Sequence, residues 1–164
     1  MGNHDVQYLH YPHNRCSGFR VSMQKDLSIL LNENKESFKL AYQFKNYLFT
    51  HAGVSTIWYR ELLRLPVGLM LSESSENLAD MLNKLEDTNA RYILYSAGYH
   101  RGGNGHGGIL WADRQETIRD SLDGYHQIVG HTAMDEVTRN TYPGTSITYI
   151  DVLHHHTYFH ELDI

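Results

Sequence analysis

Apolar residues follow two different periods in successive segments of this chain, and this alternation restricts the folds that it can adopt. Residues 38–45 alternate apolar with polar side chains, which is the period of a half-buried strand. Residues 78–85 instead place leucine and methionine at i, i+3, i+4 and i+7 of a helix. The other predicted elements are helices at 24–34, 55–65 and 114–122, strands at 47–49, 91–95 and 126–129, a tight turn at 45–46, and a closing hairpin of 146–153 and 157–164 joined across 154–156. Alternating strands and helices with a closing hairpin imply a layered α/β fold with mixed sheets.

Polar residues next to the predicted helices indicate where these helices begin and end. Ser55 is expected to cap the helix at 55–65, and Pro66 to end it, because proline disfavours helical geometry in the residue before it. Ser74 is expected to cap the helix that contains 78–85. Asp113 and Glu116 form a capping-box pair for the helix at 114–122.

Composition excludes several classes of protein. The 164 residues suit a single domain spanning 1–164, with 41% hydrophobic residues and no apolar run near the roughly 18 that a membrane span needs. A net charge of −5 without a basic stripe argues against a nucleic-acid partner. Cys16 is the single cysteine, and the first fifteen residues carry His, Asp, Asn and Pro where a signal peptide would be apolar, so we expect a reducing, cytoplasmic location. The twelve histidines suggest metal chemistry, although many imidazoles simply lie at the surface.

Three short segments share one design, in which an apolar residue or run stops at a histidine close to glycine. They are GNHD at 2–5, YLFTHAGV at 47–54 and QIVGHT at 127–132. Imidazole nitrogens and an amide oxygen are plausible neutral donors for a divalent transition metal. A lone histidine after a strand is more often structural, so the evidence lies in the combination and order of the segments.

These three segments resemble the calcineurin-like metallophosphoesterase superfamily. GNHD is similar to the family's Gly-Asn-His-Asp/Glu block, THAG to its central histidine block and VGHT to its closing Gly-His block. Because Thr132 and Ala133 follow the histidine of the VGHT segment, the pattern resembles the phosphoprotein-phosphatase branch. The resemblance implies a four-layer α/β-β/α sandwich and metal-dependent hydrolysis of phosphate monoesters, as in bacterial serine/threonine protein phosphatases.

The resemblance also implies roles for individual residues. Asn3, His51 and His131 match ligands of one metal, and His4 matches the histidine that donates a proton to the leaving group. Asp5 matches the last position of its block and is a second catalytic candidate. A turn carboxylate that binds nearby backbone amides is the alternative for Asp5, and the residues favour it.

Family members of this branch bind the substrate phosphate through arginines. Arg101, in a glycine-rich loop that lacks the ending of a nucleotide P-loop, and Arg114, after GGILWADR, are the candidates. An incidental surface position is at least as plausible for either arginine. The histidines at 154–156 are expected to form a solvated turn rather than a metal site.

The family has two further blocks, Asp-x-His and Gly-Asp-x-x-Asp, and neither occurs in this sequence. The resemblance therefore implies a C-terminal portion of the domain, with the first βαβ part missing. The intact family site holds two ions of Mn, Fe or Zn, and we expect at most one here. The expected substrate is a phosphoprotein or a small phosphoester. The alternative is an inactive remnant that binds metal or pairs an exposed sheet edge with another copy to form a homo-oligomer.

Overall fold

A five-stranded mixed sheet forms the centre of the protein in a computed structural model that describes residues 1–157 and 159–162. The strand order is β1-β2-β3-β5-β4. The strands are β1 (Ala41–Phe44), β2 (Tyr47–Thr50), β3 (His126–Val129), β4 (Thr138–Tyr142) and β5 (Thr145–Tyr149). The pairs β2·β3 and β3·β5 are parallel, whereas β1·β2 and β4·β5 are antiparallel. The predicted α/β class with a mixed sheet is confirmed.

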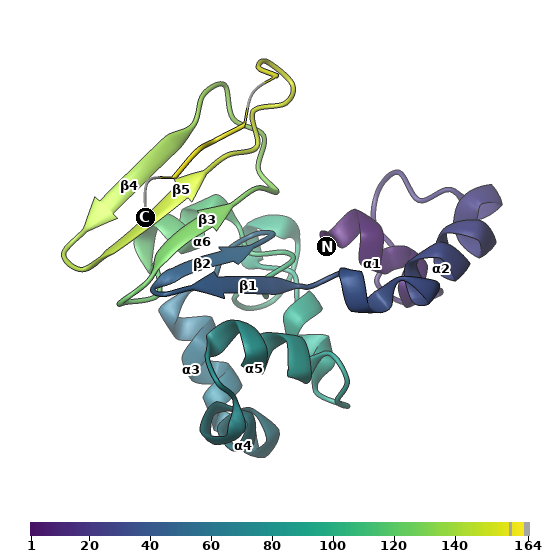
Figure 1. Cartoon of the computed structure of the whole chain (residues 1–164), viewed down its shortest axis with the longest axis horizontal. Coiled ribbons are helices and arrows are strands. Elements are labelled where there is room, and N and C mark those ends of the chain that lie inside the picture. Colours follow the sequence, from purple (N-terminus) through teal and green to yellow (C-terminus); the bar gives the residue numbers. More distant parts are fainter. Residues whose placement is uncertain (158, 163–164) are drawn as a thin grey trace.

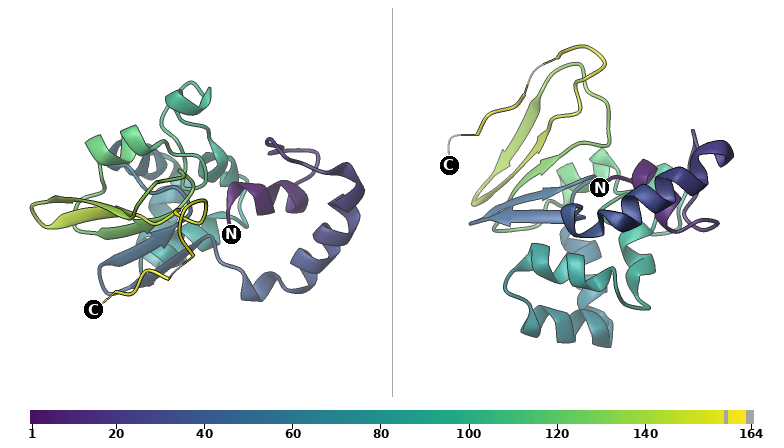
Figure 2. Two further views of the ribbon diagram at one scale, coloured as in Figure 1. Left: turned by 90° about the horizontal axis from the view of Figure 1, so that it is seen from above. Right: turned by 45° about the vertical axis from the view of Figure 1, so that its right-hand side comes forward.

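Helices α1 to α5 lie in two groups around this sheet, and α6 lies apart from both (Figure 1). The α-helices are α1 (Asn3–Leu9), α2 (Gln24–Glu33), α3 (Thr56–Arg64), α4 (Pro66–Ser74), α5 (Leu78–Leu85) and α6 (Arg114–Arg119). The 3-10 helices are η1 (Val21–Met23), η2 (Lys35–Ser37), η3 (Arg91–Tyr95) and η4 (Tyr99–Arg101). Helices α3, α4 and α5 stack below β1 and β2, and α1 with α2 lies beyond the end of β1 where that strand begins (Figures 1 and 2).

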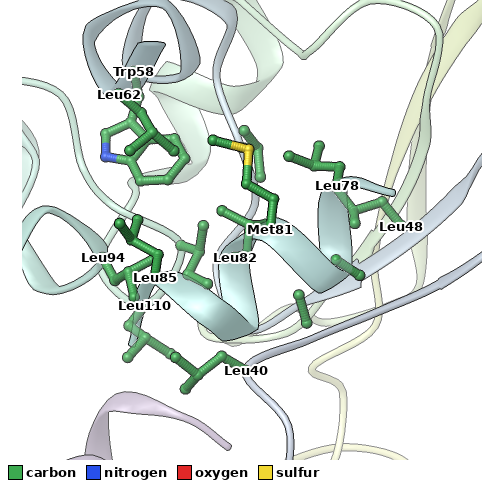
Figure 3. Packing of buried hydrophobic residues seen from close by; sticks show 14 of the residues in the cluster. Leu40, Leu48, Trp58, Leu62, Leu78, Met81, Leu82, Leu85, Leu94 and Leu110 are labelled. Carbon is green, nitrogen blue, oxygen red and sulfur yellow. The ribbon is translucent and has the colours of Figure 1, made fainter. Parts of the chain in front are cut away.

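The main hydrophobic core lies between α3, α5 and the strands β1 and β2 (Figure 3). Trp58 and Leu62 of α3 are fully buried and face the apolar stripe of α5. Leu48 of β2 closes the core from the sheet side. The helical period that predicts α5 therefore corresponds to its buried face.

The outer edge of β1 is partly covered by the side chain of Asn83. Its Oδ1 accepts from the backbone N–H groups of Leu40 (2.9 Å) and Ala41 (3.2 Å), and its Nδ2 donates to Ala41 O at 2.8 Å. One amide side chain thus takes the place of a neighbouring strand at the start of β1. The predicted turn between β1 and β2 is present, with Lys45 in the left-handed region at φ 53°.

The helix boundaries only partly follow the prediction. Ser55 caps α3 by accepting from Trp58 N at 3.2 Å, as expected. Helix α4 is absent from the sequence prediction, which used Pro66 only as the end of a helix. In the structure Pro66 is also the first residue of α4, a position where its missing N–H is not needed. Ser74 lies in α4, and the cap of α5 is Asn77, which accepts from Asp80 N at 3.0 Å.

The strand prediction for 91–95 is wrong, since this segment is the 3-10 helix η3. A five-residue apolar run cannot be distinguished from a buried helical turn by period alone. Here the carbonyl of Ile93 accepts from Trp58 Nε1 at 3.1 Å, so a core side chain takes a bond that a strand would give to its neighbour.

The predicted hairpin of 146–153 and 157–164 is also wrong, because the C-terminal hairpin of the structure is formed by β4 and β5. Strand β5 overlaps the predicted 146–153 region at residues 146–149 but pairs with β4, which the sequence analysis did not predict. Residues 157 and 159–162 form no strand, and residues 158, 163 and 164 of the predicted second strand lie outside the described residues. The sequence of β4, TRNTY, is polar almost throughout, so it lacks the apolar alternation by which a strand is predicted.

Two broader expectations concern the number of sheets and the presence of a membrane span. Within residues 1–157 and 159–162 the strands form one sheet rather than the two central sheets of a four-layer sandwich. None of the helices in the described part of the chain combines the length and apolar character needed to cross a bilayer.

Candidate functional site

The structure brings together the three residues that the sequence assigns to a metal. His51 Nε2 lies 2.8 Å from Asn3 Oδ1 and 3.0 Å from His131 Nδ1. The two imidazole rings meet edge to face, with centroids 4.8 Å apart. His51 Nε2 therefore lies within hydrogen-bonding distance of one polar atom on each of the other two residues.

Sheet topology explains why two of these residues meet. His51 directly follows β2 and His131 follows β3, and these strands are parallel neighbours. The carboxyl ends of parallel neighbours lie at the same edge of a sheet, where binding sites are commonly built. A backbone bond from Gly130 N to His51 O, 3.0 Å long, continues the pairing into the site.

Asn3 reaches the site from a different kind of element. The sequence analysis treats GNHD like the end of a strand, whereas Asn3 is the first residue of α1. Its side chain is almost fully buried, with 2% of the residue exposed. The N-terminal end of α1 therefore points the amide at the two histidines.

Two local features hold the histidine rings in their places. A Cβ added to Gly2 would lie 2.7 Å from His51 Cε1, so only glycine permits this close approach of helix and ring. His131 has φ +64°, a left-handed conformation that is uncommon for a residue with a side chain. Such backbone strain is concentrated at functional sites.

Both histidines are uncharged at neutral pH. Burial, together with the charges of the amino terminus and His4, lowers the pKa of His51 to about 4. Burial also lowers the pKa of His131 to about 4, helped by His51, Arg101 and His4, while Asp113 opposes the shift. Neutral imidazole is the form that binds a metal.

Hydrogen bonding alone does not satisfy this cluster. A neutral imidazole carries one proton, and an amide oxygen carries none. If His51 Nε2 holds a proton, Asn3 Oδ1 and His131 Nδ1 compete for it. If His51 Nε2 is unprotonated, it accepts from His131, and Asn3 Oδ1 then faces a lone pair. One of the two short contacts therefore lacks a proton of its own.

A divalent cation fits this donor set. Tetrahedral zinc binds imidazole nitrogens at about 2.0–2.1 Å, which places ligand atoms roughly 3.3 Å from one another. The observed separations of 2.8 and 3.0 Å require only a small outward movement. Among the described residues no group of three or more His, Cys, Asp and Glu side chains is placed to hold a metal, so the amide of Asn3 is essential to this set.

The two catalytic candidates on α1 behave differently. His4 is exposed and follows Asn3 directly in α1. Asp5 Oδ2 accepts from Gly2 N at 2.7 Å and caps α1, in agreement with the alternative of a carboxylate bound to nearby backbone.

Arg101 lies next to the cluster and is held by two neighbours. Its Nη2 donates to Thr132 Oγ1 at 2.8 Å, and its Nε lies 3.0 Å from Asp113 Oδ2. Thr132 follows His131 directly, so this arginine is fixed close to the histidine pair. The sequence analysis assigned Asp113 only to a helix cap. Asp113 caps α6 as predicted, through Gln115 N at 2.8 Å, but it also positions Arg101.

Arg114 packs against an aromatic ring rather than against the histidine pair. Its guanidinium lies over the Tyr149 ring, 5.4 Å from the centroid, and no bond in the described residues joins it to the histidine pair. Glu116, the expected partner in the capping box, accepts instead from Gly107 N at 2.8 Å. The Nε atoms of Arg101 and Arg114 and the outer Nε2 of His131 are buried with no hydrogen-bond partner in the described residues, so the contact of Arg101 Nε with Asp113 is an ion pair without hydrogen-bond geometry.

His51 borders an open cleft of about 420 Å³. Other walls of this cleft are formed by Asp5, Tyr42, Phe49 and Gly130. Of the three residues in the cluster, His51 is the one that lines this cleft.

Comparisons with known proteins leave the family open. No family model and no curated protein matches the sequence. One solved structure is similar, a cold-active protein-tyrosine phosphatase from a psychrophilic Shewanella species, with 17% identity and a TM-score of 0.46. The match covers 92% of this chain and 48% of the other, so the chain spans about half the length of that protein. A likeness this low does not show a shared activity.

Proposed function

We propose that this chain carries a metal-dependent phosphoesterase site of the calcineurin-like metallophosphoesterase type, in the phosphoprotein-phosphatase branch. The observation that supports it most is the convergence of Asn3 Oδ1, His51 Nε2 and His131 Nδ1 within 3.0 Å contacts that hydrogen bonding alone does not satisfy. The order of the GNHD, THAG and GHT segments supports the same proposal.

In this proposal the three residues hold one ion of Mn, Fe or Zn. The ion would supply Lewis acidity toward a phosphate oxygen and lower the pKa of a bound water. Arg101 binds the phosphate, since Asp113 and Thr132 fix its Nε and Nη2 beside the cluster. His4, exposed at the start of α1, donates a proton to the leaving oxygen. The substrate is a phosphoprotein or a small phosphoester that enters through the cleft beside His51.

Metal binding is tested first in a parent variant without the exposed histidines at 154–156, because these side chains bind stray cations. His131→Gly removes one ligand and still tolerates the left-handed backbone at this position. We expect this variant to bind Zn²⁺ or Mn²⁺ at least tenfold more weakly and to lose metal-dependent hydrolysis of p-nitrophenyl phosphate. His106→Ala, which removes another half-buried histidine, is the matched control. Equal rates and affinities for the parent and His131→Gly would contradict the proposal.

The role of His4 has a separate test. Leaving-group protonation matters little for nitrophenolate, but it is needed for an alkoxide. We therefore expect His4→Gln to slow hydrolysis of an alkyl phosphate at least tenfold more than hydrolysis of p-nitrophenyl phosphate. An equal loss on both substrates would remove His4 from the role of general acid.

The alternative of a remnant that pairs its β1 edge with another copy has less support. Asn83 occupies the hydrogen-bonding groups at the start of this edge strand. Chromatography with light scattering tests the alternative directly, since it requires a dimer and no metal-dependent turnover.

A further inference from the structure

A second buried polar cluster joins α1 to the main core, away from the candidate metal site. His10 Nε2 lies 2.6 Å from Glu86 Oε1 and 3.0 Å from the Tyr95 hydroxyl. The Tyr95 hydroxyl donates to Glu86 Oε2. Glu86 and Tyr95 are buried, each with 8% of the residue exposed.

The buried carboxylate of Glu86 needs a hydrogen-bond donor at each of its two oxygens. A buried carboxylate is costly unless donors satisfy both of its oxygens. Tyr95 gives its one proton to Oε2, so the imidazole of His10 must donate the proton that Oε1 receives. Loss of His10 would leave Glu86 with one oxygen unsatisfied.

His10 and Asn3 lie at opposite ends of the same helix. Asn3 is the first residue of α1 and His10 is its C-terminal cap, so about 10 Å of rigid helix separates them. Between them Val6 is fully buried in the main core. The polar bonds of α1 to the rest of the core thus include one at each end, to His51 and to Glu86.

We propose that His10, held by Glu86 and Tyr95, is a positioning residue for Asn3. By fixing the C-terminal end of α1, it keeps Asn3 Oδ1 within bonding distance of His51 Nε2 at the other end. Its effect on metal affinity rests on the proposed function, whereas its effect on the contact between Asn3 and His51 does not.

The first test needs no metal. His10→Leu removes the donor to Glu86, and His10→Gln retains an N–H group at a similar distance from the backbone. We expect His10→Leu to change the ring ¹⁵N chemical shifts of His51 in the metal-free protein, and His10→Gln to leave them close to those of the parent. Leu62→Ala, a destabilising change in the core of α3, is the control and should not change them. Unchanged His51 shifts in His10→Leu, or equal changes in Leu62→Ala, would overturn the proposal.

The second test is a double-mutant cycle of His10 and Asn3 in the parent variant that lacks the histidines at 154–156. We expect His10→Leu to weaken Zn²⁺ binding about tenfold, as is typical for groups that orient metal ligands. In an Asn3→Ala background the same change should weaken binding less than twofold, because the residue that it positions is gone. Equal losses in both backgrounds would show a general structural effect and overturn the proposal. If the parent binds no metal, the proposed function fails, and the His51 shifts alone decide the role of His10.

Discussion

Gly2→Ala is the sharpest perturbation of the candidate site that does not touch a ligand. The new Cβ would lie 2.7 Å from Cε1, 2.9 Å from Nδ1 and 3.1 Å from Nε2 of His51. Carbon atoms in contact prefer about 3.5–4.0 Å, so the closest pair must separate by roughly 0.8 Å or more. The backbone of Gly2 cannot easily give way, because its N–H is bound by Asp5 and its carbonyl accepts from Asp5 N and Val6 N.

A movement of that size exceeds what a metal site tolerates. Metal–ligand distances in proteins lie within about 0.2 Å of their usual values. We expect Gly2→Ala to weaken Zn²⁺ binding by a factor of about 10–100, measured by competition with a chromophoric chelator. Stability should fall by about 1–3 kcal/mol, because the overpacked contact with the His51 ring adds to the poorer N-cap that alanine makes.

Gly105→Ala is the control for this experiment, because a Cβ at Gly105 meets nothing within 4 Å and the residue does not need a positive φ. It should leave metal affinity unchanged. If Gly2→Ala binds Zn²⁺ within twofold of the parent while remaining folded, the ring of His51 is not fixed by Gly2, and the geometry derived for the site is incorrect.

Three further substitutions test other contacts. Asp113→Asn removes the charge that holds Arg101, so KM for p-nitrophenyl phosphate should rise several-fold while Zn²⁺ affinity stays constant. Gln127→Leu leaves the N–H of Val54 unpaired in the core, while the Val54 carbonyl keeps its bond from Leu122 N, and should lower the free energy of unfolding by about 1–3 kcal/mol in urea titrations. Asn83→Ala uncovers the edge of β1, so it should lower stability by about 2–3 kcal/mol and promote dimers in light scattering; a stable monomer would show that this amide does not protect the edge.

The sequence predicts those elements whose signals are local. The side-chain cap at Ser55, the apolar stripe of α5 and the strand β3 are present as expected, because each depends on a few adjacent residues. The run at 91–95 was misassigned because its conformation depends on the distant indole of Trp58, which binds the carbonyl of Ile93. Tertiary contacts of this kind leave no trace in the period of a segment.

The candidate site shows the same division. The positions of Asn3, His51 and His131 were predicted from short motifs, and the structure places them in contact. The sequence does not reveal that His131 has a left-handed backbone or that Asp113 reaches Arg101. These features depend on how β3 and α6 meet in space.

The three candidate ligands are far apart along the chain, and this spacing gives a bound cation a second consequence. Separations of 48 residues between Asn3 and His51, and of 80 between His51 and His131, mean that one ion would cross-link two long loops. Closing such loops removes conformational entropy from the unfolded chain. An ion that binds only the folded form also raises its stability as the ion concentration rises. The cation would thus act as a staple, and the melting temperature and the resistance of α1 to proteolysis should both increase along a zinc titration.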